Sequence, residues 1–213
     1  MFEQVLPKTA KSSLALLGAS GLLNDSYLAG GTALALQIGH RISVDFDFFT
    51  RKKFDAKDLA RKFEEAKIGF SLDRFEENTI LGSVDKTKFS LFFYDYPLID
   101  KTIPYLGITL ASLKDIAAMK LLAVSDRGIK RDFIDLYFML AVEKFFSMEN
   151  VLGFYDEKFK TLPQNQGHLL RSLVYFKDAD TTDVPKMLKA VSWKDVKKFF
   201  ETEAKYLAKQ LIL

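Results

Sequence analysis

Hydrophobic and polar residues in the first half of the chain follow helical spacing in some segments and strand-like alternation in others. Apolar residues at helical spacing predict helices over residues 8–19, 32–38 and 55–65. Alternation of apolar and polar residues predicts strands over residues 44–49, 69–75, 79–84 and 89–96. Because the last three strands follow one another without a helix between them, they predict a small mixed or antiparallel sheet with helices on one side.

The second half of the chain has helical spacing almost throughout. Ser112-Leu113-Lys114-Asp115 resembles a capping box and predicts the start of a helix at this point. Further periodicity predicts helices over residues 116–124, 131–146, 165–176, 182–190 and 192–211. We therefore expect an α+β protein, with an α/β domain over residues 1–108 and a helical domain over residues 109–213.

Two aspartates lie on one face of the predicted strand over residues 44–49. Successive strand residues point to opposite faces, so Asp45 and Asp47 project together while Phe46 and Phe48 point into a core. Two carboxylates roughly 7 Å apart repel each other and resist burial unless a cation neutralises them. Mg²⁺ or Mn²⁺ fits such a pair and commonly takes phosphate oxygens as further ligands. The alternative is a strand whose acidic side simply faces water.

A glycine pair lies upstream of these carboxylates. Gly30-Gly31-Thr32 precedes a short helical run, an arrangement in which backbone N–H groups can approach a phosphate closely. Arg41 and Ser43 lie between the glycines and the aspartates, where they could contact phosphate or be ordinary polar loop residues.

Composition indicates a protein with a substantial core and excludes some kinds of site. The 213 residues include 20 Phe and are 48% hydrophobic, enough for a substantial core, and core packing accounts for the aromatic content. No apolar run is long enough to span a membrane, so we expect no membrane partner. The lack of cysteine excludes disulfides and thiolate zinc sites and fits a cytoplasmic protein. A net charge of +3 does not by itself indicate nucleic-acid binding.

The glycine pair and the D-x-D strand together resemble the first motif of the AbiEii/AbiGii-type toxin nucleotidyltransferases, which belong to the DNA polymerase β-like superfamily. A later motif, with Lys120 in Lys120-Leu121-Leu122-Ala123 followed by Arg131 and Asp132, is also similar to that family. The resemblance covers roughly residues 25 to 140, and more loosely the remainder.

This resemblance implies a site contributed by both halves of the chain. Asp45 and Asp47 would hold Mg²⁺ or Mn²⁺ and act in catalysis together with Lys120 and Asp132. A larger set would bind the nucleotide: Gly30, Gly31, Thr32, Arg41, Ser43, Lys120 and Arg131. Lys120 could instead extend its ammonium to water, and Asp132 could simply favour a helix N-terminus.

The sequence departs from the superfamily pattern at one position. A third carboxylate is usual on a neighbouring strand, but Ser90 occupies the place where we would expect it. The third ligand is therefore missing, or Asp95 or Asp132 supplies it.

The implied function is transfer of NMP from an NTP to an RNA acceptor such as tRNA, or to a protein hydroxyl. The protein would be the toxin of a toxin–antitoxin or abortive-infection module and would have a cognate antitoxin. The missing third carboxylate supports an alternative, a weak or inactive nucleotide-binding or regulatory protein on the same fold. Transfer of the γ-phosphoryl group is a third possibility.

Overall fold

The computed structural model describes residues 1–160 and 166–210, which form two compact units. The first unit is Met1–Ser112, and the second begins at Leu113. None of the helices in the described ranges is both long and apolar enough to cross a membrane.

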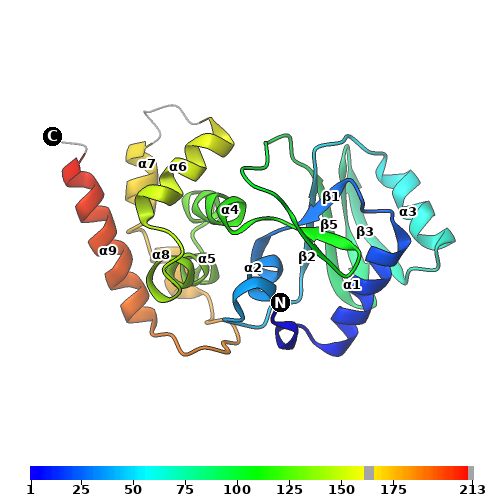
Figure 1. Ribbon diagram of the computed structural model, residues 1–213, viewed down its shortest axis with the longest axis horizontal. Helices are drawn as coiled ribbons and strands as arrows, with labels where there is room; N and C mark the ends of the chain where they lie inside the picture. The colour runs from blue at the N-terminus through cyan, green and yellow to red at the C-terminus, as the bar shows by residue number, and fades with distance from the viewer. Residues whose placement is uncertain (161–165, 211–213) are drawn as a thin grey trace. The chain divides into compact units, whose positions relative to one another are not determined.

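The first unit contains a seven-stranded mixed sheet with the order β3-β4-β5-β2-β1-β7-β6 (Figure 1). Its strands are β1 (Ser26–Leu28), β2 (Phe46–Thr50), β3 (Phe70–Glu76), β4 (Thr79–Val84), β5 (Thr87–Phe93), β6 (Ile103–Tyr105) and β7 (Ile108–Leu110). β2 is parallel to β5 and β1 is parallel to β7, whereas the other neighbours are antiparallel. The predicted α+β class with a mixed sheet is confirmed.

One face of this sheet carries the core of the first unit. Phe46 and Phe48 of β2 are fully buried, as alternation predicts, and Phe48 contacts the ring of Phe89 on β5. Phe63 of α3 (Ala56–Glu65) packs edge-on against Phe89. α3 begins where the side chain of Asp55 accepts a hydrogen bond from the Asp58 backbone N–H, a standard N-cap. The remaining helices of the unit are η1 (Glu3–Val5), α1 (Lys8–Ser20) and α2 (Gly30–Ile38).

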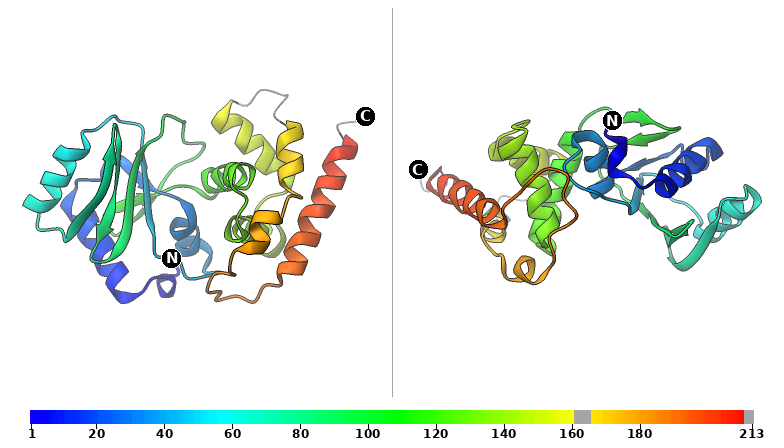
Figure 2. Two further views of the ribbon diagram at one scale, coloured as in Figure 1. Left: turned by 180° about the vertical axis from the view of Figure 1, so that it is seen from behind. Right: turned by 90° about the horizontal axis from the view of Figure 1, so that it is seen from below.

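The second unit is helical. It contains α4 (Leu113–Asp126), α5 (Lys130–Tyr137), the π-helical turn η2 (Phe138–Val142), α6 (Met148–Phe159), α7 (Gln166–Ser172), α8 (Lys177–Thr181) and α9 (Trp193–Gln210). α9 packs against α5 and α7 (Figure 2). Phe133 lies at the centre of this core, where its ring contacts Phe176, Trp193 and Phe200.

Several predicted elements differ from those observed. The helix predicted over residues 182–190 is wrong: after α8 this segment has no helix, because Pro185 lacks an N–H and disfavours helical backbone at Val184. α6 was not predicted, although Ser147 and Asn150 form a capping box at its start. The helix predicted over 131–146 changes to a π turn after Tyr137. Residue 165 and residue 211, the outer limits of two predicted helices, lie outside the described residues.

Candidate functional site

The backbone pairing of β1 and β2 places the glycine pair, which follows β1, beside the strand that carries Asp47. Leu28 pairs with Phe48, and the backbone N–H of Ala29 donates to the carbonyl oxygen of Asp47 at 2.9 Å. Gly30 follows with φ +68°, a left-handed conformation that side chains rarely adopt. A Cβ at this position would lie 3.3 Å from Asp47 Oδ2, so the glycine backbone lies directly beside the carboxylate. The sequence prediction that these two features meet agrees with this geometry.

Asp47 also contacts β5, the strand that pairs with the other edge of β2. Parallel pairing of β2 and β5 places Ser90 opposite Asp47, and Ser90 Oγ donates a 2.7 Å hydrogen bond to Asp47 Oδ1. A hydroxyl thus occupies the position where a third carboxylate was sought. Asp95 lies beyond the end of β5 with a side chain that is 69% exposed, 4.0 Å from Arg51. Within the described ranges, no three His, Cys, Asp or Glu side chains gather closely enough to hold a metal ion.

Asp45 lies one residue before β2, and hydroxyl groups hold its backbone. Thr32 Oγ1 donates to the carbonyl oxygen of Asp45 at 2.6 Å and lies 3.0 Å from Ser43 Oγ. Thr32 is buried, whereas Ser43, Asp45 and Asp47 are half-buried. Thr32 and Ser43 therefore hold the loop that carries Asp45 in place.

Arg41 places a buried positive charge against the second glycine. Its side chain is nearly inaccessible, and Nη1 donates to the carbonyl oxygen of Ile42 at 3.2 Å. A Cβ on residue 31 would lie 2.2 Å from Arg41 Nη2, so Gly31 leaves the space that the guanidinium occupies. We refer to Gly30, Gly31, Arg41, Asp45 and Asp47 as the acidic corner.

The acidic corner suits a small hard cation. Its carboxylates are those of Asp45 and Asp47, both half-buried, and the Ser90 hydroxyl is hydrogen-bonded to that of Asp47. Mg²⁺ is commonly bound by one or two protein carboxylates and completes its shell with water and substrate phosphate. The all-oxygen donor set therefore fits Mg²⁺ or Mn²⁺ in the presence of a phosphate ligand, and it does not resemble a closed all-protein cage.

A second charged cluster lies within the helical unit. Lys120 of α4 is 5% exposed, and its Nζ lies 2.9 Å from Asp132 Oδ1 and 2.6 Å from Asp135 Oδ2 on α5. Arg127 adds a second cation, with Nε 2.9 Å from Asp132 Oδ2. Burial alone would raise the pKa of Asp132, but Lys120 and Arg127 outweigh it and hold this pKa below its usual value.

The sequence suggests Asp135 as a neighbour of Asp132, because a spacing of three residues puts both on one face of a helix. Asp135 is as fully buried as Asp132. Arg127 was not predicted as a partner of this cluster. Arg131, predicted to bind the nucleotide, is exposed at the start of α5. A further buried pair joins Lys158 of α6 to Asp115 of α4 at 2.7 Å, so Asp115 has a role beyond the capping box suggested by the sequence.

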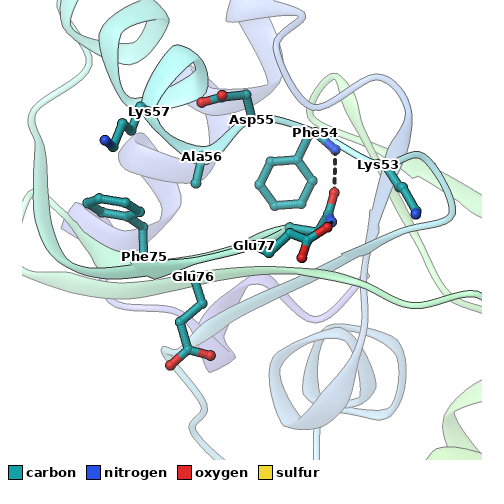
Figure 3. A pocket seen from close by; sticks show the side chains of 9 residues that line it. Lys53, Phe54, Asp55, Ala56, Lys57, Phe75, Glu76 and Glu77 are labelled. Atoms are coloured by element: carbon teal, nitrogen blue, oxygen red, sulfur yellow. Dashed lines mark hydrogen bonds between the residues drawn. The ribbon is translucent and has the colours of Figure 1, made fainter.

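One hollow in the first unit lies away from the acidic corner. A cavity of about 560 Å³ is lined by the segment from Lys53 to Lys57 and by the β3–β4 turn (Figure 3). Phe54 N donates to Asn78 Oδ1 across it, and the rings of Phe54 and Phe75 face its interior. This cavity is near the end of β2 opposite to Asp45, so it is not part of the candidate site.

A family model matches most of this chain. The sequence model of the family described as nucleotidyl transferase AbiEii toxin, type IV toxin–antitoxin system, matches residues 14–206. An uncharacterized protein of Aquifex aeolicus (strain VF5) is 35% identical over 204 residues, which cover 94% of this chain and 96% of that protein.

Two solved structures share the fold. JHP933 from Helicobacter pylori superposes with a TM-score of 0.58 at 18% identity, with 97% of this chain and 94% of that chain covered. MenT4, a nucleotidyltransferase toxin from Mycobacterium tuberculosis H37Rv, gives a TM-score of 0.55 at 15% identity, with coverage of 93% and 86%.

Proposed function

Because the chain belongs to the AbiEii family of nucleotidyltransferase toxins, we propose that it transfers a nucleoside monophosphate from an NTP to a hydroxyl group of an RNA or protein acceptor. The observation that carries the proposal is the position of the Asp47 carboxylate against Gly30, where glycine backbone and acidic side chains meet. In the reaction, the acceptor hydroxyl loses its proton to solvent and its oxygen bonds to the α-phosphorus. The bond from the α-phosphorus to the oxygen that bridges to the β-phosphate breaks, and pyrophosphate leaves with that electron pair.

Asp45 and Asp47 are the residues that would hold Mg²⁺ or Mn²⁺. A bound divalent ion would neutralise triphosphate charge and stabilise the attacking and leaving oxygens of an in-line displacement. The hydrogen bond from Ser90 orients the carboxylate of Asp47, and the Thr32 contact fixes the backbone of Asp45. These contacts support a pre-organised pair of ligands.

Gly30, Gly31 and Arg41 would bind the phosphates of the nucleotide. The backbone N–H groups at the start of α2 favour negative charge, and the buried guanidinium of Arg41 lies against the same turn. A charge-assisted hydrogen bond to phosphate is stronger than a neutral one. We therefore assign Arg41 to the triphosphate and Thr32 and Ser43 to supporting the loop.

From the family resemblance we also propose that Lys120, Arg131 and Asp132 of the helical unit act in the reaction. The exposed guanidinium of Arg131 is available to contact phosphate. Asp132 is a poor candidate for the base, because its lowered pKa makes it a weak proton acceptor. Its ion pairs instead support a positioning role, in which Asp132 holds the ammonium of Lys120 in place.

Labelled nucleotides test the proposal. The protein is incubated with α-³²P- or γ-³²P-labelled NTPs, Mg²⁺ or Mn²⁺, and total tRNA. We expect label transfer from the α-position only, with a loss of at least about 100-fold in Asp47→Asn, since metal and electrostatic stabilisation supply several kcal/mol. Asp95→Asn is the matched control, because this exposed carboxylate lies beyond the end of β5. Transfer of γ-label would show a phosphotransferase instead.

A second candidate function rests on Ser90. With a hydroxyl opposite Asp47, the corner offers two carboxylates rather than three, which favours a protein that binds nucleotide with weak or no turnover. Tight NTP binding by the wild-type protein without label transfer to any acceptor would support this alternative and contradict the transferase.

The family also leads us to propose a biological setting. The protein would act as a toxin in the cytoplasm, where NTPs and tRNA are found, and a cognate antitoxin would restrain it. We expect growth arrest on expression of the wild type and normal growth on expression of Asp47→Asn at equal protein level. Arrest that persists with the variant would contradict a role for transfer in toxicity.

A further inference from the structure

Aromatic side chains share a sheet face with the acidic corner. On β2, Asp47 and Phe49 point to the face opposite the buried Phe48. The parallel register pairs Asp47 with Ser90 and Phe49 with Phe92, so both aromatic residues lie one strand repeat, roughly 7 Å, beyond the carboxylate.

These rings form a continuous strip that leads away from the acidic corner. Phe49 contacts Phe92 at a centroid distance of 5.7 Å and Tyr94 at 5.1 Å, and Tyr94 contacts Tyr96 at 4.8 Å. Tyr27 of β1 is buried and stacks against Phe49 at 6.0 Å with an interplanar angle of 25°. We call Phe49, Phe92, Tyr94 and Tyr96 the aromatic strip.

The aromatic strip differs from the aromatic core in its exposure. Phe46, Phe48 and Phe89 on the core face are at most 2% exposed. Phe49, Phe92 and Tyr94 are half-buried, and Tyr96 is 39% exposed. Core packing, the expectation from composition, therefore does not account for these four rings.

Basic residues follow the aromatic strip at its far end. The backbone N–H of Tyr94 donates to the carbonyl oxygen of Thr50 at 2.8 Å, so the strip reaches the last residue of β2. The next three residues are the exposed Arg51, Lys52 and Lys53. Along the direction of β2, carboxylates thus come first, aromatic rings follow, and positive charges come last.

We propose that the aromatic strip stacks with unpaired nucleobases of a single-stranded RNA acceptor whose terminal hydroxyl lies at the acidic corner. The inference rests on the proposed function for the location of the reacting hydroxyl. Aromatic rings bind bases of any sequence through their faces, and neighbouring lysine and arginine side chains follow the phosphate backbone. The order along β2 matches such a ligand: reacting end, bases, and then phosphates of the following nucleotides.

Binding of normal and abasic RNA separates base stacking from phosphate contacts. An eight-nucleotide oligo(A) and an abasic oligomer of equal length are titrated into the full-length protein by fluorescence anisotropy. Phe92→Leu keeps apolar volume but removes the ring, and Tyr96→Ala alters an exposed residue, so at least one variant should keep its fold. Phe93→Leu is the matched control, since it is the next residue on β5 and points to the opposite face.

We expect the wild type to prefer oligo(A) over the abasic oligomer by at least about ten-fold. Each strip variant should reduce this ratio by roughly five-fold or more, because stacking contributes about 1–3 kcal/mol per base. Phe93→Leu should leave it within about two-fold. If both strip variants are folded and their preference for oligo(A) over the abasic oligomer is unchanged, the inference is overturned. A rise in the KM for NTP without any change in RNA binding would also overturn it. Because binding is measured without turnover, failure of the transferase proposal would be seen separately, as missing label transfer with stacking intact.

Discussion

Replacing Lys120 with methionine should destabilise the helical unit far more than loss of a surface lysine. Its ammonium lies between two fully buried carboxylates, 2.9 Å from Asp132 and 2.6 Å from Asp135. The two aspartates are balanced by Lys120 and Arg127, so the variant leaves one buried negative charge without compensation. Removal of one partner of a buried ion pair costs about 3–5 kcal/mol, and we expect a loss of this size in the free energy of unfolding at pH 7.5.

The same reasoning fixes the pH dependence. In the wild type the folded-state pKa of Asp132 lies below its unfolded value. Its stabilising contribution is therefore complete above about pH 4 and is lost as the pH falls through the lower, folded-state pKa. Without Lys120, burial should raise this pKa, so the carboxylate takes up a proton at higher pH. The cost of Lys120→Met should then be smaller at pH 4.5 than at pH 7.5.

Urea denaturation at the two pH values measures both effects. Arg127→Met is the comparison variant: this residue pairs with the same Asp132, but its side chain is 53% exposed and already largely solvated, so we expect a smaller loss than for Lys120→Met. A cost for Lys120→Met below 1 kcal/mol, or one that is equal at both pH values, would refute the account of the cluster.

Other predictions concern positions where a small change tests the geometry. Ser90→Asp puts a carboxylate opposite Asp47, so the metal-free protein should lose up to about 4 kcal/mol of stability by repulsion, and Mn²⁺ should raise its melting temperature more than that of the wild type; equal shifts would contradict the site. Gly18→Ala should cost about 1–3 kcal/mol in urea denaturation, since its Cβ would lie 1.9 Å from the carbonyl oxygen of Leu106. Gly153→Ala, in an exposed part of α6 with open space around it, should instead gain roughly 1 kcal/mol, and a loss there would be evidence against the helix.

Local features of the fold could be predicted because they depend on neighbours in sequence. Alternation located β4 at its observed bounds, Thr79–Val84, and the periodicity of Leu59 and Phe63 located α3 within a residue. β1 and β6 have three residues each, too few to show a period. Pro185 excluded a helix that the apolar spacing alone favoured.

Pairs of residues from distant elements could not be predicted in the same way. Ser90 was chosen from the sequence as the place of a missing acid, but its bond to Asp47 depends on the parallel register of β2 and β5. Lys158 gave no signal, because only the packing of α6 on α4 brings it to Asp115 across 43 residues. Such long-range contacts depend on tertiary packing, on which a periodic pattern carries no information.

The outer strand of the sheet has a consequence for behaviour at high concentration. β3 ends the sheet, and every residue after Phe70 in it is exposed. The unpaired backbone groups of such a strand can pair with strands of neighbouring molecules. Asp73, Arg74 and Glu76 put charges of both signs along β3, however, and its register with β4 shifts between Leu72 and Arg74. These charges and the shift act against fibre growth, and a version with a smooth, uncharged outer strand would be expected to gel or precipitate.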